Sequence, residues 1–348
     1  MKKSCQVSLT DEGSARYCSY ISSTSQALGP RGSEAAGSGE PSGGWAFVTH
    51  PDYRRAGPAP KARSGAVGAL TRPVDRRATG GRARRFPGVL IATWNVNSLN
   101  ARLPRVEEWL GLVQPDVLCM QETKMSDAQF PGMDFQRLGY DSVHHGQGRW
   151  NGVAILSRVG IEDVTAGFDD DEEPDPDARI LWATCGGVRV CSVYVPNGRE
   201  VGADHYVYKL GWLRRLRGVL DAHHSPDEPL VILGDWNIAP TDQDVWDPAA
   251  FEGATHVTPE ERAALEEVKG WGLVDTLRRR YPEDGIFSYW DYRNGDFHKR
   301  RGMRIDYLLS SPALAERSRA DLIDRNARKG SKPSDHAPVL GLFEAVTA

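Results

Sequence analysis

The sequence predicts an α/β fold in which mixed β-sheets pack face to face and helices cover their outer surfaces. Short apolar runs recur from Val89 onwards, and most are bounded by Gly, Pro, Asn or Asp, which is typical of buried strands. Amphipathic helical patterns lie between some of these runs. Other runs follow one another directly, so the sheets cannot consist of strand–helix–strand units alone and must be mixed.

Eight strands and three helices are predicted. The strands span residues 89–96, 116–122, 152–157, 179–185, 188–195, 230–236, 304–310 and 339–345. The helices span residues 102–113, 203–224 and 258–272. The last of these begins with a capping box, in which Thr258 is the N-cap, Pro259 takes the first position and Glu261 follows three residues after the cap.

The composition is that of an ordinary globular protein, with 348 residues of which 40% are hydrophobic and 26% charged. No run of eighteen apolar residues occurs, and the start of the chain lacks the apolar segment of a secretory signal, so no membrane association is expected. The five cysteines are odd in number and never spaced as CxxC, which argues against a disulfide framework or a zinc site and for a reducing, cytoplasmic location.

Residues 1–86 differ in character from the rest, so we divide the chain into this extension and a catalytic domain over residues 87–346. The extension is rich in Gly, Ser, Ala, Arg and Pro and shows no sustained period, which predicts disorder. It holds 14 basic and 6 acidic residues, whereas the remainder holds 29 basic and 41 acidic residues. Three interpretations stay open: a solvated tail, a non-specific nucleic-acid contact, and translated upstream sequence before a start near Val89.

Polar side chains stand where the predicted strands end or begin. These residues are Asn95, Asn97, Gln121, Glu122, Tyr194, Asn197, Asp235, Asn237, Asp306, Asp335 and His336. Taken singly, most have a structural explanation as a turn former, or as a surface ion pair such as Glu122 with Lys124. Asp306 is different, because an acid inside an apolar strand needs a partner, and His336 is the natural one. The coincidence of so many polar strand ends favours one shared site.

This inventory matches one kind of chemistry. Oxygen ligands without a Cys or His cluster suit Mg²⁺ or Mn²⁺ better than Zn²⁺. A histidine supported by an acid, a separate aspartate and several amides suit phosphodiester hydrolysis, in which the metal offsets charge and an acid/base pair moves protons.

The motifs TWNVNS, QETK, NGVAILS, YVPNG, GDWN, FSYWDYR, RGMRIDYLL and KPSDHAP occur in this order over residues 89–344. In this set and order the chain resembles the exonuclease III family, within the endonuclease/exonuclease/phosphatase superfamily. The resemblance implies a four-layer α/β sandwich. It also implies a metal site in which Glu122 is the principal ligand, Asn95 and Asp335 lie nearby, and Asn97 supports the metal shell.

The resemblance also implies roles around the phosphate. Asp235 would activate the attacking water or protonate the leaving oxygen, and Asn237 would hold the phosphate or the water. His336, oriented by Asp306, would bind the non-bridging oxygens. Two further residues would flank the leaving oxygen and the phosphate, Tyr194 and Asn197.

The stretch over residues 287–307 favours a DNA substrate among the branches of the superfamily. It would supply an apolar pocket for a flipped abasic sugar, from Tyr289, Trp290, Met303 and Ile305. It would also supply contacts to the DNA backbone, from Lys299, Arg300, Arg301 and Arg304. The alternatives are core packing for the aromatic residues and a solvated loop for the basic ones. Tyr289 and Met303 depart from residues common in the family, which leaves the pocket's shape open.

The expectation is therefore a Mg²⁺-dependent DNA repair nuclease, monomeric and nucleoid-associated, that incises 5′ of abasic sites, cleans blocked 3′ ends and degrades duplex DNA from 3′ termini. One alternative is a phosphatase or phosphodiesterase of small phosphates or lipids, against which the basic loop argues. The other is a non-catalytic DNA-binding module, which would not need Asp306 behind His336.

Overall fold

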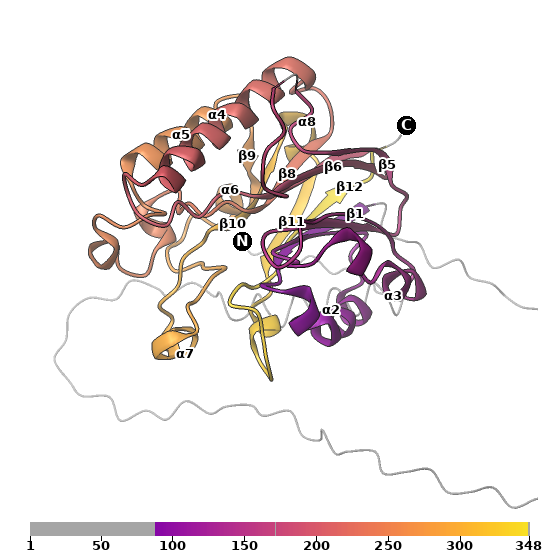
Figure 1. Cartoon of the computed structure of the whole chain (residues 1–348), viewed down its shortest axis with the longest axis horizontal. Coiled ribbons are helices and arrows are strands. Elements are labelled where there is room, and N and C mark those ends of the chain that lie inside the picture. The colour runs from indigo at the N-terminus through magenta and orange to yellow at the C-terminus, as the bar shows by residue number, and fades with distance from the viewer. Residues whose placement is uncertain (1–87, 171, 347–348) are drawn as a thin grey trace, which may run out of the picture.

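Two six-stranded sheets lie face to face in the computed structural model, which describes residues 88–346 apart from residue 171 (Figure 1). Helices α4 and α5 cover the outer side of one sheet, and α2 and α3 cover the other. The prediction of mixed sheets with outer helices, and of four layers, is confirmed. The extension predicted over residues 1–86 lies outside the described residues.

The first sheet has the strand order β11-β12-β1-β2-β4-β3, in which only β1 and β2 are parallel neighbours. Its strands are β1 (Gly88–Asn95), β2 (Val117–Gln121), β3 (Asp141–His145), β4 (Val153–Ser157), β11 (Ser318–Ile323) and β12 (Val339–Glu344). The second sheet has the order β5-β6-β7-β8-β10-β9, in which only β7 and β8 are parallel neighbours. Its strands are β5 (Glu162–Ala166), β6 (Ile180–Cys185), β7 (Val188–Tyr194), β8 (Leu230–Asp235), β9 (Val274–Asp275) and β10 (Asp306–Ser310).

The α-helices vary widely in length. They are α2 (Leu99–Val113), α3 (Gly132–Arg137), α4 (Asp204–His223), α5 (Pro259–Lys269), α6 (Thr276–Arg280), α7 (Asp296–Lys299) and α8 (Pro312–Ala315). Short 3₁₀ turns complete the connections, as η2 (Asp127–Gln129), η3 (Asp242–Asp244), η4 (Pro248–Phe251), η5 (Arg293–Gly295) and η6 (Arg325–Arg328). The predicted capping box of α5 forms, with Thr258 and Glu261 exchanging hydrogen bonds. Helix α2 begins three residues before the predicted start, and its first residue, Leu99, is fully buried.

The alternation of side chains along β1 explains why both faces of the first sheet are apolar. Val89 and Ile91 point into the core between the sheets, whereas Leu90 and Trp94 pack beneath α2. Full burial of an aliphatic side chain of this size contributes about 1.5–3 kcal/mol. The strand is therefore held on both sides, and residues at its end are placed with little freedom.

Sheet register brings the predicted polar residues to one edge. Because β1 and β2 are parallel, Asn95 and Gln121 end side by side, and antiparallel β12 begins at the same edge, close after His336. In the second sheet, Tyr194 pairs with Asp235, and Asp235 pairs with Asp306. Within the described part of the chain, no helix has the length and apolarity needed to cross a bilayer.

Candidate active site

Asn95 joins the polar ends of the two sheets. Its side-chain amide donates hydrogen bonds to Glu122 Oε1 and to Asp235 Oδ2, each at 2.8 Å. Asn95 and Asp235 are both essentially buried, at 0% and 1% exposure. One amide therefore fixes the spacing between a carboxylate of the first sheet and a carboxylate of the second.

His336 and Asp306 form the predicted acid–imidazole pair. His336 Nδ1 lies 2.8 Å from Asp306 Oδ2, and Ser288 Oγ donates to the same oxygen at 2.7 Å. Burial alone would lower the pKa of His336, but the carboxylates of Asp306 and Asp235 outweigh burial and raise that pKa to about 10. The imidazole is thus protonated at neutral pH, with Nδ1 donating to Asp306 and Nε2 directed toward Asp235, 3.9 Å away.

Asp235 has the opposite electrostatic situation. Burial raises its pKa to about 7; the protonated His336 opposes that rise, and the nearby charges of Asp306 and Glu122 add to it. A carboxyl with a pKa near neutrality can both accept and return a proton during one reaction cycle.

Glu122 and Asp335 are held at the site by a lysine and an asparagine. Lys124 Nζ lies 2.7 Å from Glu122 Oε2 and also donates to Asn97 Oδ1 at 2.5 Å. Asn97 in turn donates to both carboxylate oxygens of Asp335, at 3.1 and 3.2 Å. Burial acts to raise the pKa of Glu122, but Lys124 and the hydrogen bond from Asn95 outweigh it and hold that pKa below its usual value. Glu122 therefore does form the ion pair with Lys124, but this pair lies inside the site and not on the surface.

Four residues of the site adopt left-handed backbone conformations, with φ of 44° for Asn97, 52° for Glu122, 53° for Lys124 and 52° for Asn237. For a residue with a Cβ, this conformation costs about 1 kcal/mol. Neighbouring loops hold the backbone in place, as Ser98 N donates to the Glu122 carbonyl at 2.7 Å and Thr123 N to Gly152 at 3.1 Å. Such strain is characteristic of functional positions.

Glu122, Asp235 and His336 form a group that could hold a metal, because one ligand atom from each lies within 4.8 Å of the others. The two carboxylates supply oxygen donors, while His336 is hydrogen-bonded through Nδ1 to Asp306. Oxygen donors of this kind suit a hard divalent cation. Asp335, predicted as a ligand, is connected to this group through Asn97.

The remaining predicted phosphate-side residues line the second sheet's edge. Asn237 N donates to Asp235 Oδ1 at 3.0 Å, and Asn197 Nδ2 donates to Asn237 Oδ1 at 3.2 Å. Burial raises the pKa of Tyr194 well above its usual value, so its hydroxyl keeps its proton. Arg179 stacks on the Tyr194 ring with Cζ 4.7 Å from the ring centroid.

A buried ion pair that was not predicted from the sequence lies beneath these asparagines. Lys209 Nζ contacts Glu261 Oε1 at 2.5 Å, and it donates to the Asn237 carbonyl at 2.7 Å and to the Asn197 carbonyl at 3.2 Å. His256 Nδ1 donates to the same Asn237 carbonyl at 2.5 Å. The available signal was the position of Lys209 on the buried stripe of α4, where a lysine requires a partner.

The predicted sugar-pocket residues separate into two groups. Met303 and Ile305 form a small apolar cluster against which Tyr289 packs, and the Tyr289 ring lies 4.9 Å from that of His336. Trp290 lies instead in the core between the sheets, 1% exposed, where it packs against Phe297. For Trp290 the structure thus favours the alternative of core packing.

The predicted basic residues separate as well. Lys299, Arg300 and Arg301 are exposed at and after the end of α7, and Arg301 stacks on Trp246 at 4.9 Å. The prediction that Arg304 contacts the DNA backbone is wrong. Its side chain is 1% exposed and forms 2.6 Å ion pairs with the two acids Asp244 and Asp275, so its charge is already neutralised inside the protein.

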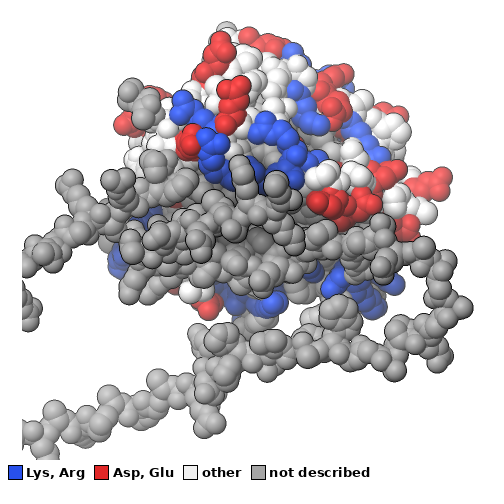
Figure 2. All heavy atoms as spheres, turned by 180° about the vertical axis from the view of Figure 1, so that it is seen from behind, with Lys and Arg blue, Asp and Glu red and all other residues white. Residues whose placement is uncertain are grey.

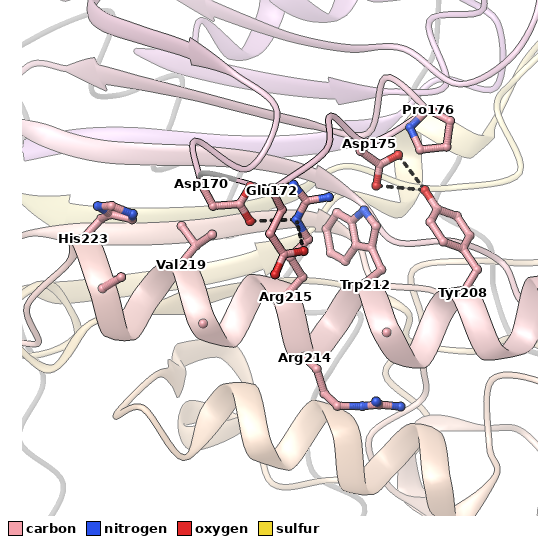
Figure 3. A pocket seen from close by; sticks show the side chains of 13 residues that line it. Asp170, Glu172, Asp175, Pro176, Tyr208, Trp212, Arg214, Arg215, Val219 and His223 are labelled. Carbon is pink, nitrogen blue, oxygen red and sulfur yellow. Dashed lines mark hydrogen bonds and ion pairs between the residues drawn. The ribbon is translucent and has the colours of Figure 1, made fainter.

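A pocket of about 670 Å³ lies elsewhere, between the loop around Asp170 and the outer face of α4 (Figure 3). Its acids already have partners, because Arg215 pairs with Asp170 and the Tyr208 hydroxyl donates to Asp175 at 2.7 Å. The acids of this pocket are therefore paired with arginine and tyrosine, whereas those at the sheet edges are grouped around the imidazole of His336.

Comparison with known proteins places this geometry in a family. Residues 92–336 match the endonuclease/exonuclease/phosphatase family. The chain is 34% identical over 267 residues to the exodeoxyribonuclease III of Haemophilus influenzae, an alignment covering 72% of this chain and 98% of that relative. An AP endonuclease from Archaeoglobus fulgidus superimposes with a TM-score of 0.71 at 38% identity, covering 74% of this chain and 99% of that one.

A third relative is the 3′ phosphatase NExo from Neisseria, solved bound to a product DNA hairpin. It superimposes with a TM-score of 0.70 at 39% identity, covering 73% of this chain and 99% of that one. From the family match and the extent of these alignments, the chain belongs to the exonuclease III family of the endonuclease/exonuclease/phosphatase proteins.

Proposed function

We propose that this chain is a divalent-metal-dependent DNA repair nuclease that hydrolyses phosphodiester bonds. The observation that carries the proposal is the position of Asp235, which is buried between Asn95 and the protonated His336. A proton acceptor for the attacking water thus lies beside a fixed positive charge that can bind the oxygens of the phosphate.

In this proposal Asp235 accepts the proton of the attacking water. His336 donates from Nε2 to a non-bridging oxygen of the phosphate, and Asp306 holds the imidazole in place and protonated. Glu122 and Asp335 would hold Mg²⁺ or Mn²⁺, supported by Asn95 and Asn97. The metal, when bound, would polarise the phosphate and offset its developing charge.

Two asparagines and a tyrosine complete the phosphate side. Asn237 and Asn197 present amides held in register by their mutual hydrogen bond and by Lys209 beneath them. Tyr194, whose hydroxyl keeps its proton, would donate a hydrogen bond to the leaving oxygen.

The names of the relatives support DNA as the substrate, since they include an exodeoxyribonuclease, an AP endonuclease and a 3′ phosphatase solved with DNA. We propose incision 5′ of abasic sites, removal of 3′ blocking groups and 3′→5′ degradation of duplex DNA. Tyr289 would receive the base-free sugar, with Met303 and Ile305 packed behind it, and Lys299, Arg300 and Arg301 would contact the backbone. We propose that the protein acts as a monomer in the cytoplasm and that residues 87–346 form its catalytic unit.

The test is a duplex with one abasic site, labelled at the 5′ end of the damaged strand and incubated with the full-length protein and Mg²⁺. An undamaged duplex, an EDTA reaction and the variant Asp235→Asn serve as controls. Metal-dependent incision 5′ of the lesion is expected. Shortening of both duplexes from their 3′ ends alone would keep the nuclease and remove the abasic selectivity. If neither duplex is cleaved with Mg²⁺ or Mn²⁺ while a small phosphate ester is hydrolysed, the DNA assignment is wrong.

A further inference from the structure

Two arginines of η6, Arg325 and Arg328, form an arginine cluster beside the active site. Both guanidinium groups face the same aromatic side chain, with Cζ of Arg325 at 5.4 Å and Cζ of Arg328 at 5.0 Å from the Phe297 ring centroid. Arg325 also lies 5.2 Å from the Trp290 ring. Two like charges are therefore drawn together over one aromatic surface.

No carboxylate forms an ion pair with this cluster among the residues that the structure describes, and the nearest acidic influence is the charge of Asp335 acting on Arg328. Neither Arg325 nor Arg328 forms an ion pair there, and the Nε atoms of both are buried without a hydrogen-bond partner. Two other arginines differ, because Arg304 pairs with two acids and Arg280 pairs with Asp321. Burying cationic groups without a partner is costly, and an anion bound from solution would offset that cost.

The two arginines have different surroundings. Arg328 is 6% exposed and donates to the Ser334 carbonyl and, at 3.4 Å, to that of Trp290. Arg325 is half-buried, and its side chain makes no hydrogen bond within the described residues. Arg328 therefore anchors the cluster, while the outer nitrogens of Arg325 are free to donate to a ligand.

The cluster is connected rigidly to the active site. Trp290 N donates to the Asp335 carbonyl at 3.0 Å, and Ser334 Oγ donates to that of Asn95 at 2.7 Å. A ligand held by the arginines would thus be fixed relative to Asp335 and Asn95. On the face seen in Figure 2, both basic and acidic side chains lie on the part of the surface that the structure describes.

We infer that the arginine cluster binds a backbone phosphate of duplex DNA that flanks the phosphate being cleaved. The inference rests on the proposed function, and it adds η6 to the contacts expected from the α7 loop. Planar guanidinium groups suit phosphate oxygens, to which they donate pairs of hydrogen bonds. The contact reads no base, so it sets affinity and register on the duplex without affecting sequence preference.

The test compares Arg325→Gln with Arg319→Gln in the full-length protein. Arg319 is paired with Glu344 near the start of β11, so the control removes the same charge away from the cluster. Binding of a fluorescent duplex with an abasic-site analogue is followed by anisotropy in EDTA over a series of KCl concentrations. Arg325→Gln should weaken binding about tenfold and reduce the slope of log affinity against log salt by about one, while the control changes neither. In cleavage assays the loss should appear in KM rather than kcat.

Three outcomes would overturn the inference in distinguishable ways. Wild-type protein that cleaves the abasic duplex, with an unchanged salt slope in Arg325→Gln, removes the phosphate contact and leaves the proposed function standing. Wild-type protein that neither binds nor cleaves the duplex removes both. A melting temperature raised by inorganic phosphate in wild type but not in Arg325→Gln, with equal DNA binding by both, would assign the cluster to a free anion. Equal melting temperatures of the two variants without phosphate confirm that both are folded.

Discussion

Arg304 and Asp306 stand two residues apart at the start of β10, and they belong to charged clusters of opposite kinds. Around Arg304, two acids and a second arginine pair at 2.5 to 2.6 Å, so positive and negative charges match. Around Asp306, the acids Glu122, Asp235 and Asp306 face one imidazolium and one lysine. Both clusters are buried, but only the first is balanced by the protein itself.

Only the unbalanced cluster has charge left over for a ligand from solvent. A buried cluster whose charges are balanced gains little by binding an ion from solvent. Its arginine is buried and cannot contact DNA. The unbalanced cluster leaves the pKa of Asp235 near 7 and an excess of carboxylate oxygens, which a divalent cation and a phosphate can use.

Asp235→Asn should abolish the unbalanced cluster's chemistry. The amide is nearly isosteric but cannot accept a proton from water, so the rate of phosphodiester hydrolysis should fall about 10³-fold, equivalent to about 4 kcal/mol. Single-turnover cleavage of an abasic duplex measures this loss. The free energy of unfolding should stay level or rise, because a desolvated carboxylate has been removed. A large drop in stability would instead indicate that Asp235 is structural.

Arg304→Met should have the reverse effect. Removing the shared cation leaves Asp244 and Asp275 buried with fewer partners, so the free energy of unfolding should fall by about 3 kcal/mol. Denaturant titration measures the change. DNA affinity and its salt dependence should match wild type at temperatures where the variant is folded. A reduced salt slope would restore Arg304 to the DNA surface.

Adding Mg²⁺ should stabilise the molecule through the unbalanced cluster. A cation bound only by the folded state at a hundred times its dissociation constant adds about 2.7 kcal/mol. Thermal unfolding with and without Mg²⁺ should show this rise in wild type, and a smaller one in Glu122→Gln. The same rise in both proteins would exclude Glu122 as the principal ligand.

His336 should lose its raised pKa when Asp306 is neutralised. In wild type the pKa is about 10, so the stability from its pairing is fully present below its unfolded pKa of about 6.5 and is lost as the pH rises through about 10. In Asp306→Asn the carboxylate that raises the pKa most is gone, and the pKa should return toward its usual range. Nitrogen chemical shifts of the imidazole measure it directly. A His336 that stays protonated to high pH in the variant would point to Asp235 as its main partner.

The strands show how far the sequence predicts this fold. All eight predicted strands are interior to their sheets, and the four that were missed, β3, β5, β9 and β11, are the edge strands. Interior strands are buried on both faces and read as apolar runs, whereas an edge strand such as β5 is largely exposed. The local signal is therefore weakest where the sheet ends.

The site divides in the same way. Asn95, Glu122, Asp235 and His336 were predicted because polar residues at the ends of buried strands stand out in sequence. Arg304 follows the same rule but was misassigned, because its acid partners come from residues about 30 and 60 positions away in the chain.

By itself, the sequence determined the fold class, the interior strands and the set of polar residues that the sheets bring to one edge, because burial on both faces and polar strand ends are local properties. Only the tertiary structure decided which charges are balanced. It paired Arg304 with Asp244 and Asp275, set Lys209 under the asparagines, and left Arg325 and Arg328 without an ion pair among the described residues. The physical reason is that pairing depends on distances of a few ångströms between segments far apart in the chain, and no local pattern encodes those distances.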